Sequence, residues 1–529
     1  MTGRGARLLW LLYGAIAVVS VVLVLRRPPW DRLSDLHIYH GAIRHLQAGQ
    51  PLYDFEAQNG GPFTYPPFAA VVLWPIGYLA EAPLRIAWLL VTCAAVAAIA
   101  VALGGVIRSV RRRQQVIVAA VACALLLSAP VQSNLRFGQV SIFIVLLALV
   151  DGMGLTPARY RGILIGVAAA IKLTPLLFVL YFLVSGRWRD AARAGAAFVA
   201  CAALGAALLP GESWTFWTGT VVQTSRIGDL ASLGNQSLHG MLLRIGVDGS
   251  TFPVLWAFLV AVICGIGLLR ARQLAVAGQP AHAAVLVGCA TVAASPVSWT
   301  HHQVWPVLAA MLLIGARGTA RRAAGAALLV VMVLSLGALL SQVSQTQGLQ
   351  FLFKNARALA AIGVCVAGFG GIAVAAASSA RRSPVRRAWL RVGATAGATL
   401  AFFAVQPLPA GADPTFKAYS YDDADNPRYF FVCGSQTECR EFAAGQPISL
   451  AVTAEKTKVR VNGVVDARVA RLEYRSAPGG AARDIPLLEL YPGQRLFSFR
   501  SANLAHGHLV AYGADGNPIA SYAEELDAA

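Results

Sequence analysis

Charged residues are scarce in this chain of 529 residues, where Asp, Glu, Lys and Arg together make up only 13%. An average soluble domain contains about 25%. Hydrophobic residues reach 57%, and the mean hydropathy is +0.60. A water-soluble fold of this size cannot bury so much apolar surface. The composition therefore excludes an ordinary soluble protein and predicts a chain whose solvent is lipid.

Acidic residues are also rare before residue 409, where 10 of the 25 in the chain occur. The other 15 lie in the polar stretch that follows, which contains no long apolar run. This change predicts a membrane domain over residues 1–408 and a soluble domain over residues 409–529. The net charge of +19 does not predict a nucleic-acid partner, because the basic residues form short clusters between apolar runs, as in cytoplasmic loops.

Cysteine is sparse, with 8 residues, and six of these lie in apolar runs, where a thiol usually behaves as a small hydrophobic group. Cys433 and Cys439 are the two in the polar C-terminal stretch. Their spacing predicts a local disulfide if this domain lies in an oxidising compartment. No spacing of His and Cys resembles a zinc site, and we predict no tightly bound cofactor and no metal-binding residues, with dependence on a divalent metal left open.

Apolar sequence is abundant and predicts an all-α multispan membrane bundle of about 13 transmembrane helices. The predicted spans cover residues 8–25, 86–107, 115–129, 139–151, 162–171, 173–184, 191–209, 252–271, 281–295, 303–316, 321–341, 357–378 and 388–405. Several are shorter than the roughly 20 residues that cross a bilayer directly. Short helices are acceptable where they line a cavity inside the protein.

Arginine clusters predict the orientation of these spans. With a cytoplasmic N-terminus and strict alternation, every dense cluster falls inside, as the positive-inside rule requires. The alternation needs residues 162–184 to be a hairpin of two short helices. Pro175 disfavours helix at the preceding residue, and Lys172 would be costly at the centre of a lipid-facing span. We therefore expect Lys172 at an outer tip and the C-terminal domain outside a bacterial plasma membrane.

The same alternation places the unusual polar segments on the outer side. These are residues 34–39, 62–67, 132–139, 172–175, 235–239 and 295–302. Eight of the ten acidic residues before residue 409 also fall on this face. A reaction centre is expected where such groups gather above short helices.

These residue types suit the transfer of a sugar from a lipid phosphate to an alcohol. Asp35 is the candidate base for the acceptor hydroxyl. Cationic and hydrogen-bonding groups must stabilise the leaving phosphate. The candidates for the donor phosphate or sugar are Lys172, His301, His302, Arg136, Gln139, Asn235, Gln236 and His239. The candidates for stacking on the acceptor or a sugar are Tyr39, Tyr65, Trp214, Trp217 and Trp299.

Most candidates also have a structural interpretation. Asp35 is a favoured residue type for a helix N-cap, and Tyr65 belongs to a proline-rich turn that shapes a loop. Asn235 can satisfy backbone groups where a helix starts. Interfacial tryptophans more often anchor a protein than bind a ligand. Lys172 is the hardest to explain structurally, because charges at membrane depth are usually functional.

The segments 35–39, 49–53 and 63–68 resemble the first outer loop of the actinobacterial family 87 glycosyltransferases. The similarity continues through residues 138–140, 162–175, 235–237 and 295–302, and covers about residues 5–410. The resemblance implies a fold of the GT-C type, with a first outer loop over about residues 26–85. It also implies a polyprenyl-phosphate sugar donor and inversion at the anomeric carbon.

By this resemblance, Asp35 is the catalytic base, and Lys172 with His301 or His302 contacts the donor. Family members include mannosyltransferases that use polyprenyl-phosphomannose, and a related arabinofuranosyltransferase uses decaprenyl-phosphoarabinose. We expect a mannosyl donor, with arabinofuranose as the alternative, and a cell-envelope glycolipid or polysaccharide as acceptor. Many relatives carry two adjacent acidic residues where this chain has Ser34 and Asp35, which argues against a metal bridged by paired carboxylates.

The C-terminal stretch alternates as strands do, with Gly and Pro turns between them, and predicts a small β-sandwich-like domain. Carbohydrate binding is one role for it, and a structural or protein-contacting role is the alternative. A transporter of lipid-linked sugars is the alternative function for the whole chain. That interpretation expects functional polar residues on both faces or inverted repeats, and the sequence has neither.

Overall fold

The computed structural model describes residues 2–27, 32–57, 61–104, 111–223, 230–247, 249, 251–334 and 346–369, together with most of the segments between 417 and 522. The chain divides into two compact units. One is formed by Met1–Ala57 and Gly61–Pro409, and the other mainly by Ala410–Ala529. The functional roles predicted for the two parts of the chain stay predictions.

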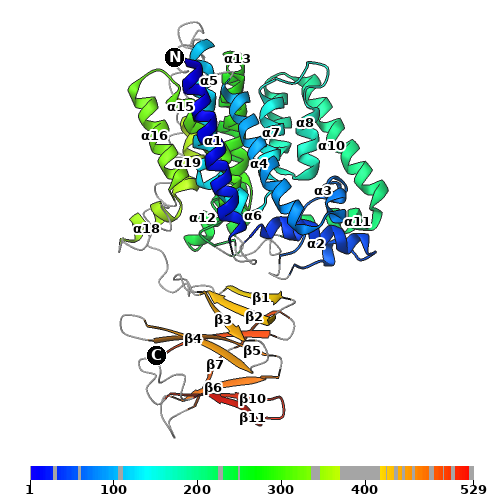
Figure 1. Ribbon diagram of the computed structural model, residues 1–529, viewed down its shortest axis with the longest axis vertical. Helices are drawn as coiled ribbons and strands as arrows, with labels where there is room; N and C mark the ends of the chain where they lie inside the picture. Colours follow the sequence, from blue (N-terminus) through cyan, green and yellow to red (C-terminus); the bar gives the residue numbers. More distant parts are fainter. Residues whose placement is uncertain are drawn as a thin grey trace. The chain divides into compact units, whose positions relative to one another are not determined.

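The first unit is helical (Figure 1). Its longer helices are α1 (Thr2–Leu25), α4 (Glu81–Gly104), α5 (Arg111–Leu127), α10 (Trp188–Leu208), α13 (Thr251–Val276), α14 (Pro280–Ala294) and α16 (Thr319–Val333). Its shorter α-helices are α2 (Ser34–Gln47), α3 (Pro67–Leu73), α6 (Ala129–Phe137), α7 (Ser141–Gly152), α8 (Ile163–Ile171), α9 (Leu177–Val184), α11 (Pro210–Thr218), α12 (Leu238–Arg244), α15 (Val304–Ile314), α18 (Gln347–Lys354) and α19 (Ala356–Ala367). Its 3-10 turns are η2 (Leu52–Asp54), η3 (Trp74–Tyr78), η4 (Thr174–Leu176), η5 (Thr220–Val222) and η7 (Thr300–His302).

By length and composition, 4 helices in the described part of the chain can cross a membrane: Arg4–Leu25, Glu81–Gly104, Trp188–Leu208 and Thr251–Val276. The bent pairs α5 with α6 and α18 with α19 raise this number to 6 if each pair is one span. The chain is therefore a multi-pass membrane protein. Thirteen crossings stay a prediction, and the predicted span 388–405 lies outside the described residues.

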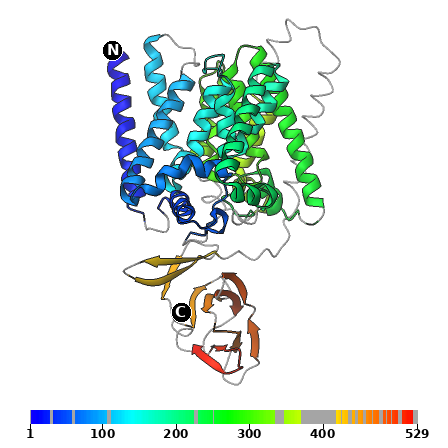
Figure 2. The same cartoon turned by 90° about the vertical axis from the view of Figure 1, so that its right-hand side faces the viewer.

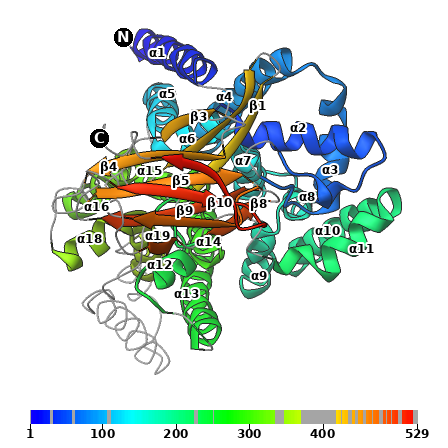
Figure 3. The ribbon, with the colours of Figure 1, turned by 90° about the horizontal axis from the view of Figure 1, so that it is seen from below.

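Helix burial separates a protein core from a lipid-facing surface. The side chains of α14 are buried on nearly every side, and this helix packs against α13, α15 and α19. In contrast, α1 exposes large apolar side chains such as Leu8 and Leu11 and lies at the edge of the bundle (Figures 2 and 3). A helix with exposed apolar side chains of this kind needs lipid around it.

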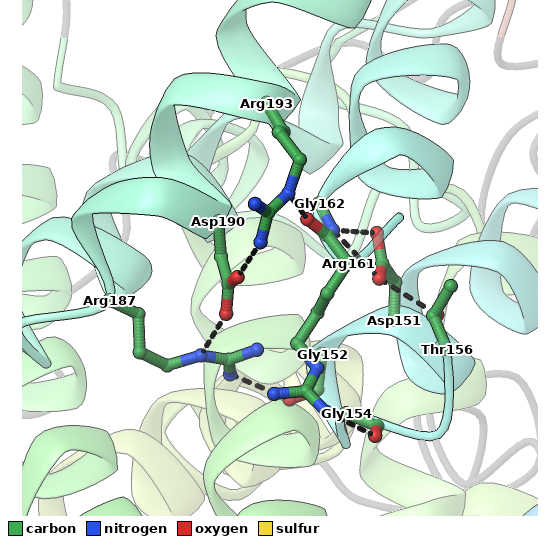
Figure 4. A network of polar contacts seen from close by, with 9 residues as sticks. All are labelled: Asp151, Gly152, Gly154, Thr156, Arg161, Gly162, Arg187, Asp190 and Arg193. Carbon is green, nitrogen blue, oxygen red and sulfur yellow. Dashed lines mark hydrogen bonds and ion pairs between the residues drawn. The ribbon is translucent and has the colours of Figure 1, made fainter. Parts of the chain in front are cut away.

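The predicted break at Lys172 is present, because its backbone is extended between α8 and η4. The start of α8 and the residues that follow α9 are joined by a polar network (Figure 4). There, Arg193 Nε donates to the carbonyl of Arg161 at 2.7 Å, and Arg187 Nη1 donates to that of Gly152 at 3.3 Å. Since the start of α8 adjoins the segment that follows α9, the two helices form a hairpin with Lys172 at its far tip.

The same network anchors the start of α8. The Asp151 carboxylate is fully buried and accepts the backbone N–H of Gly162 at 2.9 and 2.8 Å and that of Ile165 at 3.2 Å. The Thr156 hydroxyl donates to it at 2.8 Å (Figure 4). These bonds satisfy amide groups that the first turn of a helix leaves free. They fix the start of α8, whose C-terminal end is capped by Lys172.

Helix α2 lies across one end of the bundle, whereas α1 begins at the other end (Figure 1). Its buried residues Leu36, Tyr39, His40 and Ile43 follow the i, i+3, i+4, i+7 spacing of an amphipathic helix, so one face packs on the bundle. At this end, α2 packs against α3 and α6, and α6 also packs on η7.

The second unit is antiparallel β-structure. Its strands are β1 (Lys417–Asp423), β2 (Asn426–Cys433), β3 (Cys439–Ala443), β4 (Ile448–Ala454), β5 (Val459–Asp466), β6 (Arg471–Arg475), β7 (Ala482–Ile485), β8 (Leu488–Tyr491), β9 (Gln494–Ser501), β10 (His508–Tyr512) and β11 (Pro518–Tyr522). They form sheets of order β1-β2-β3, β11-β10-β6-β7 and β4-β5-β9-β8. Side chains from both four-stranded sheets, including Leu472 and Phe497, share one hydrophobic core.

The predicted disulfide concerns two residues that the backbone pairs directly. Cys433 ends β2 and Cys439 begins β3, and the two are opposite each other in the antiparallel register. Opposite residues in such a ladder bring their Cβ atoms to about 4.5–5.5 Å. Their side chains lie outside the described part of the structure, so the disulfide stays a prediction.

Candidate functional site

Asp35 lies in the first turn of α2, where the positive end of the helix dipole favours a carboxylate. It is not the N-cap, because Leu33 occupies that position without a side-chain capping bond. Leu33 has φ 55°, the left-handed conformation, which no other non-glycine residue adopts in the described part of the chain. This conformation is costly for a branched side chain and often occurs beside functional sites.

Gly138 brings α6 against the start of α2. It ends α6 in the left-handed conformation, with φ 68°, and donates its N–H to the carbonyl of Asn134. A Cβ at this position would lie 2.7 Å from Cβ of Leu36. The backbone N–H of Leu33 also donates to the carbonyl of Arg136 at 2.7 Å. The absence of a side chain at Gly138 therefore allows the next residue, Gln139, to reach Asp35.

Gln139 links Asp35 to two hydroxyl groups. Its Nε2 donates to Asp35 Oδ2 at 2.6 Å. Its Oε1 accepts from the Tyr65 hydroxyl at 3.1 Å and from the Ser141 hydroxyl at 3.2 Å. Tyr65 in turn contacts the hydroxyl of Tyr39 at 3.0 Å. Because the Tyr65 proton is used toward Gln139, the Tyr39 hydroxyl is the donor in this last bond.

Lys172 joins the same network from the hairpin tip. Its Nζ donates to Ser141 Oγ at 3.4 Å and lies 2.8 Å from Nε2 of His302. It also lies 5.2 Å from the centroid of the Tyr65 ring, which is within cation–π distance. A continuous series of polar contacts thus runs from a carboxylate on α2 to an ammonium and an imidazole. Asp35, Lys172 and His302 each keep part of their surface exposed.

The protonation of this pair depends on its surroundings. Burial raises the pKa of the Asp35 carboxyl to about 6, while the Gln139 hydrogen bond and the Lys172 charge act to lower it. Burial lowers the pKa of the Lys172 ammonium to about 8, while Asp35 acts to raise it. Burial and the nearby Lys172 hold the pKa of His302 well below its usual value. Near pH 7 the pair is a carboxylate beside an ammonium, with a neutral imidazole.

His301 and Asn134 are buried polar residues beside this network. His301 packs edge-on against His302 and Phe137, with ring centroids 4.4 and 5.5 Å apart. Within the described residues, neither ring nitrogen of His301 and neither amide atom of Asn134 has a hydrogen-bond partner. Asn134 was not among the sequence candidates, although it belongs to the polar segment 132–139. Ser141 was also missed, and no sequence pattern distinguished it.

Known proteins resemble this chain over most of their length. The profile of glycosyltransferase family 87 matches residues 63–296. The polyprenol-phosphate-mannose-dependent α-(1-2)-phosphatidylinositol mannoside mannosyltransferase of Mycobacterium tuberculosis is 33% identical over 346 residues, which are 61% of this chain and 80% of that protein. The protein of the same name from Mycolicibacterium smegmatis is 31% identical over 62% of this chain and 82% of its own length.

The chain belongs to glycosyltransferase family 87. A phosphatidylinositol pentamannoside mannosyltransferase of Mycolicibacterium smegmatis is also similar, at 31% identity over 56% of this chain and 75% of its own length. No solved structure matches the chain. Membership in a glycosyltransferase family confirms the predicted enzyme class.

In this family 87 glycosyltransferase, two of the residues predicted to bind the sugar donor form hydrogen bonds with backbone groups. Asn235 Nδ2 donates to the carbonyls of Leu230 and Pro296, and its Oδ1 accepts the N–H of Ser298 at 2.8 Å. Gln236 has the same kind of environment. Its Nε2 donates to two carbonyls and its Oε1 accepts a backbone N–H at 3.2 Å. This geometry favours a structural role, in which the Asn235 amide holds the 295–302 segment and the Gln236 amide holds the junction of α18 and α19.

The remaining residues predicted to bind the donor or a sugar make contacts outside the series from Asp35 to Lys172. Arg136 stacks on the neighbouring Phe137 ring at 5.0 Å. His239 packs edge-on against aromatic rings of α13, and its pKa is lowered by burial. Trp214 and Trp217 are exposed on α11, as membrane-interface anchors are. The backbone N–H of Trp299 donates to His302 Nδ1 at 3.1 Å.

Tyr39 and Tyr65, predicted to stack on sugars, instead have buried rings that contact each other edge-on at 5.4 Å. The geometry favours a role for their hydroxyl groups over one for their ring faces. Among the described residues, no group of three or more His, Cys, Asp or Glu side chains is arranged to hold a metal ion. The absence of a tightly bound cofactor and of metal-binding residues stays a prediction.

Proposed function

We propose that this glycosyltransferase moves a mannosyl residue from a polyprenyl-phosphate donor to a cell-envelope glycolipid or polysaccharide, with Asp35 as general base. The names of its relatives specify a polyprenol-phosphate-mannose donor, which favours mannose over arabinofuranose. They also make a phosphatidylinositol mannoside the first acceptor to test. The observation that carries the proposal is the polar series from Asp35 through Gln139 and Ser141 to Lys172 and His302.

The chemistry that this series supports is a direct displacement. Asp35 takes the proton of the acceptor hydroxyl as the hydroxyl oxygen attacks the anomeric carbon. The bond from that carbon to the phosphate oxygen breaks, and the polyprenyl phosphate leaves from the opposite face, which inverts the configuration. The Lys172 ammonium offsets the negative charge that develops on the phosphate, and His302 lies in contact with Lys172. A carboxylate with a pKa of about 6 is suited to accept a proton near neutral pH.

We place this site on the outer face of the plasma membrane. The Arg187–Asp190–Arg193 network lies at the end of the α8–α9 hairpin opposite Lys172. Basic residues accumulate in cytoplasmic loops, so this rule puts the network and the N-terminus inside. The tip with Lys172 then lies outside, and about thirteen crossings would also put the C-terminal domain there. Carbohydrate binding is the role we propose for that domain.

A reconstituted transfer assay tests the reaction. The purified protein in lipid nanodiscs receives polyprenyl-phosphate-mannose or decaprenyl-phosphoarabinose with a phosphatidylinositol mannoside acceptor. We expect transfer from the mannosyl donor only. The variant Asp35→Asn should lower kcat/KM by about 100-fold or more, the usual contribution of a general base. The matched control is Asp54→Asn, which changes an exposed carboxylate of the same loop and should retain full activity.

Three outcomes contradict parts of this proposal. Transfer from the arabinosyl donor alone would replace mannose as the sugar. Full activity of Asp35→Asn would remove Asp35 as the base, and equal loss in Asp54→Asn would mean that the loop tolerates no change. The thermal stability of each variant in detergent separates loss of chemistry from loss of fold.

A further inference from the structure

Gln139 has an amide whose orientation is set by its neighbours. Two hydroxyl groups, those of Tyr65 and Ser141, lie at 3.1 and 3.2 Å from Oε1. An ionised carboxylate can only accept, so the amide nitrogen is the atom that faces Asp35, and both hydroxyls donate to Oε1. Tyr65 is held by two further contacts: its hydroxyl lies 3.0 Å from that of Tyr39, and the Tyr53 hydroxyl donates to its backbone carbonyl at 2.8 Å. The amide nitrogen of Gln139 is therefore directed at Asp35.

This orientation makes the two oxygens of Asp35 different. Oδ2 accepts the 2.6 Å bond from Gln139. Among the described residues, none donates a hydrogen bond to Oδ1. One oxygen is fixed by the protein and the other is left to meet a substrate. Gln139 itself is buried, with 6% of its surface exposed, so a sugar has little access to it.

We propose that Gln139 is a positioning residue for the base: its amide holds Oδ2 of Asp35, so that Oδ1 receives the proton of the acceptor hydroxyl. This inference rests on the proposed function of Asp35. It differs from the sequence prediction, which assigned Gln139 to the donor. Gln139 also connects the proposed base to the proposed phosphate-binding lysine, because Lys172 donates to Ser141, Ser141 donates to Gln139 and Gln139 donates to Asp35.

The titratable groups around Asp35 come from several elements. Tyr39 lies on α2, Tyr65 precedes α3, Lys172 is the hairpin tip and His302 lies on η7 behind Lys172. Burial raises the pKa of both tyrosines above their usual values, so they stay neutral through the assay range. Burial also keeps the His302 ring neutral near pH 7. A shift of the acidic limb of a pH profile therefore reports on Asp35.

The first test is the variant Gln139→Met, which keeps the length of the side chain and removes its hydrogen bonds. A hydrogen bond from Gln139 stabilises the charged form of Asp35, so its loss raises the pKa of that carboxyl. The acidic limb of kcat/KM should move to higher pH by about one to two units. At the pH optimum of the variant, kcat should be lower than that of the parent, because the carboxylate is no longer oriented, while the KM for the donor should stay within about twofold.

A second variant tests the orientation without changing Gln139. Tyr65→Phe and Ser141→Ala each remove one donor to Oε1, and the other still orients the amide. The double variant removes both donors, so that only its bond to Asp35 still orients the amide. We expect the acidic limb to move more in the double variant than the two single shifts predict together. The matched control is Gln236→Met, a buried amide that contacts only backbone, which should lower stability without moving the acidic limb.

Other results would overturn the inference. A raised donor KM in Gln139→Met with an unmoved acidic limb would return Gln139 to the donor site. Additive shifts in the double variant would show that the hydroxyls do not orient the amide. The Asp35→Asn variant separates this failure from that of the proposed function. If Asp35→Asn is inactive and Gln139→Met keeps the parent profile, only the positioning role is wrong.

Discussion

At the scale of single residues, Asp35 and Lys172 share a site that shifts the pKa of both groups toward 7. Burial moves the pKa of the carboxyl up to about 6 and that of the ammonium down to about 8. Each charge counteracts the shift of the other, because opposite charges favour ionisation. The proposed mechanism needs Asp35 deprotonated and Lys172 protonated, and this form dominates only between these two pKa values.

This arrangement predicts a bell-shaped pH dependence of kcat/KM. Activity should fall as the pH drops through about 6, because Asp35 becomes protonated, and as it rises through about 8, because Lys172 loses its proton. In the variant Lys172→Arg, the guanidinium stays charged, so the basic limb should disappear up to about pH 10 while the acidic limb remains.

Initial rates measured from pH 5 to 10 in a constant-ionic-strength buffer check this prediction. A parent enzyme without a basic limb would show that the charge of Lys172 is not required. A basic limb that persists in Lys172→Arg would assign it to another group. Lys172→Arg at low donor concentration also reports on phosphate binding, because arginine and lysine differ in geometry.

At the scale of elements, the contact between the end of α6 and the start of α2 determines whether the site exists. Gly138 allows this contact through its left-handed backbone and its missing side chain. The contact positions Gln139, while the hairpin tip and η7 approach from the other side. The buried Asp151 carboxylate anchors the start of α8, the helix that ends at this tip. Small changes at these helix ends should therefore alter activity strongly.

The variant Gly138→Ala tests this contact. An L-residue in the left-handed region costs about 1–2 kcal/mol, and the added Cβ would also clash with Leu36. Gly186→Ala is the matched control. It has nearly the same backbone conformation, with φ 72°, and a Cβ there meets no atom within 4 Å. We expect a similar loss of thermal stability from the backbone in both variants, and a loss of transfer activity of at least tenfold only in Gly138→Ala.

Thermal unfolding in detergent and the transfer assay separate the two effects. Equal activities of the two variants, after correction for folded protein, would mean that the spacing of α2 and α6 does not control the site. Activity that Gly138→Ala loses while it stays folded would support the geometric role of this glycine.

At the scale of the whole molecule, exposed aromatic residues and basic clusters mark two opposite ends of the helical unit. Trp188 and Tyr160 are exposed beside the arginine network, whereas Tyr78, Trp214 and Trp217 are exposed on segments nearer α2 and α3. Tryptophan and tyrosine gather at both membrane interfaces, and arginine gathers on the cytoplasmic side. This distribution supports one orientation, with α2 and the candidate site facing outward.

Cysteine labelling tests this orientation in intact cells. Gln50→Cys lies on an exposed loop after α2, and Ala158→Cys lies on an exposed loop between α7 and α8. Both are made in a chain with Cys433→Ser and Cys439→Ser. A membrane-impermeant maleimide should label Gln50→Cys in intact cells and Ala158→Cys only after permeabilisation. The double-serine chain without a new cysteine gives the background labelling. Labelling of Ala158→Cys but not Gln50→Cys in intact cells would show the opposite orientation in the membrane.

Much of this protein is readable in its sequence, because the deciding signals are local. Apolar runs of helical length predict the bundle, and the change to alternating polar sequence predicts the β-unit. Pro175 beside Lys172 predicts the break between α8 and α9, which the structure contains. Asp35, Gln139, Lys172 and His302 stand out in the sequence as polar residues in an apolar chain, and the resemblance to family 87 glycosyltransferases implies roles for Asp35, Lys172 and His301 or His302 in one reaction.

What each of these side chains contacts was decided only by the tertiary structure. Gln139 and Asp35 are 104 residues apart, and Lys172 and His302 are 130 residues apart. Asn235, Gln236 and Gln139 are similar amides in sequence, yet the first two bind backbone groups and the third binds a carboxylate. Hydropathy and backbone preference depend on neighbours along the chain. Hydrogen-bond partners and pKa values depend on neighbours in space, which only the packing of α2, α6, η7 and the hairpin brings together.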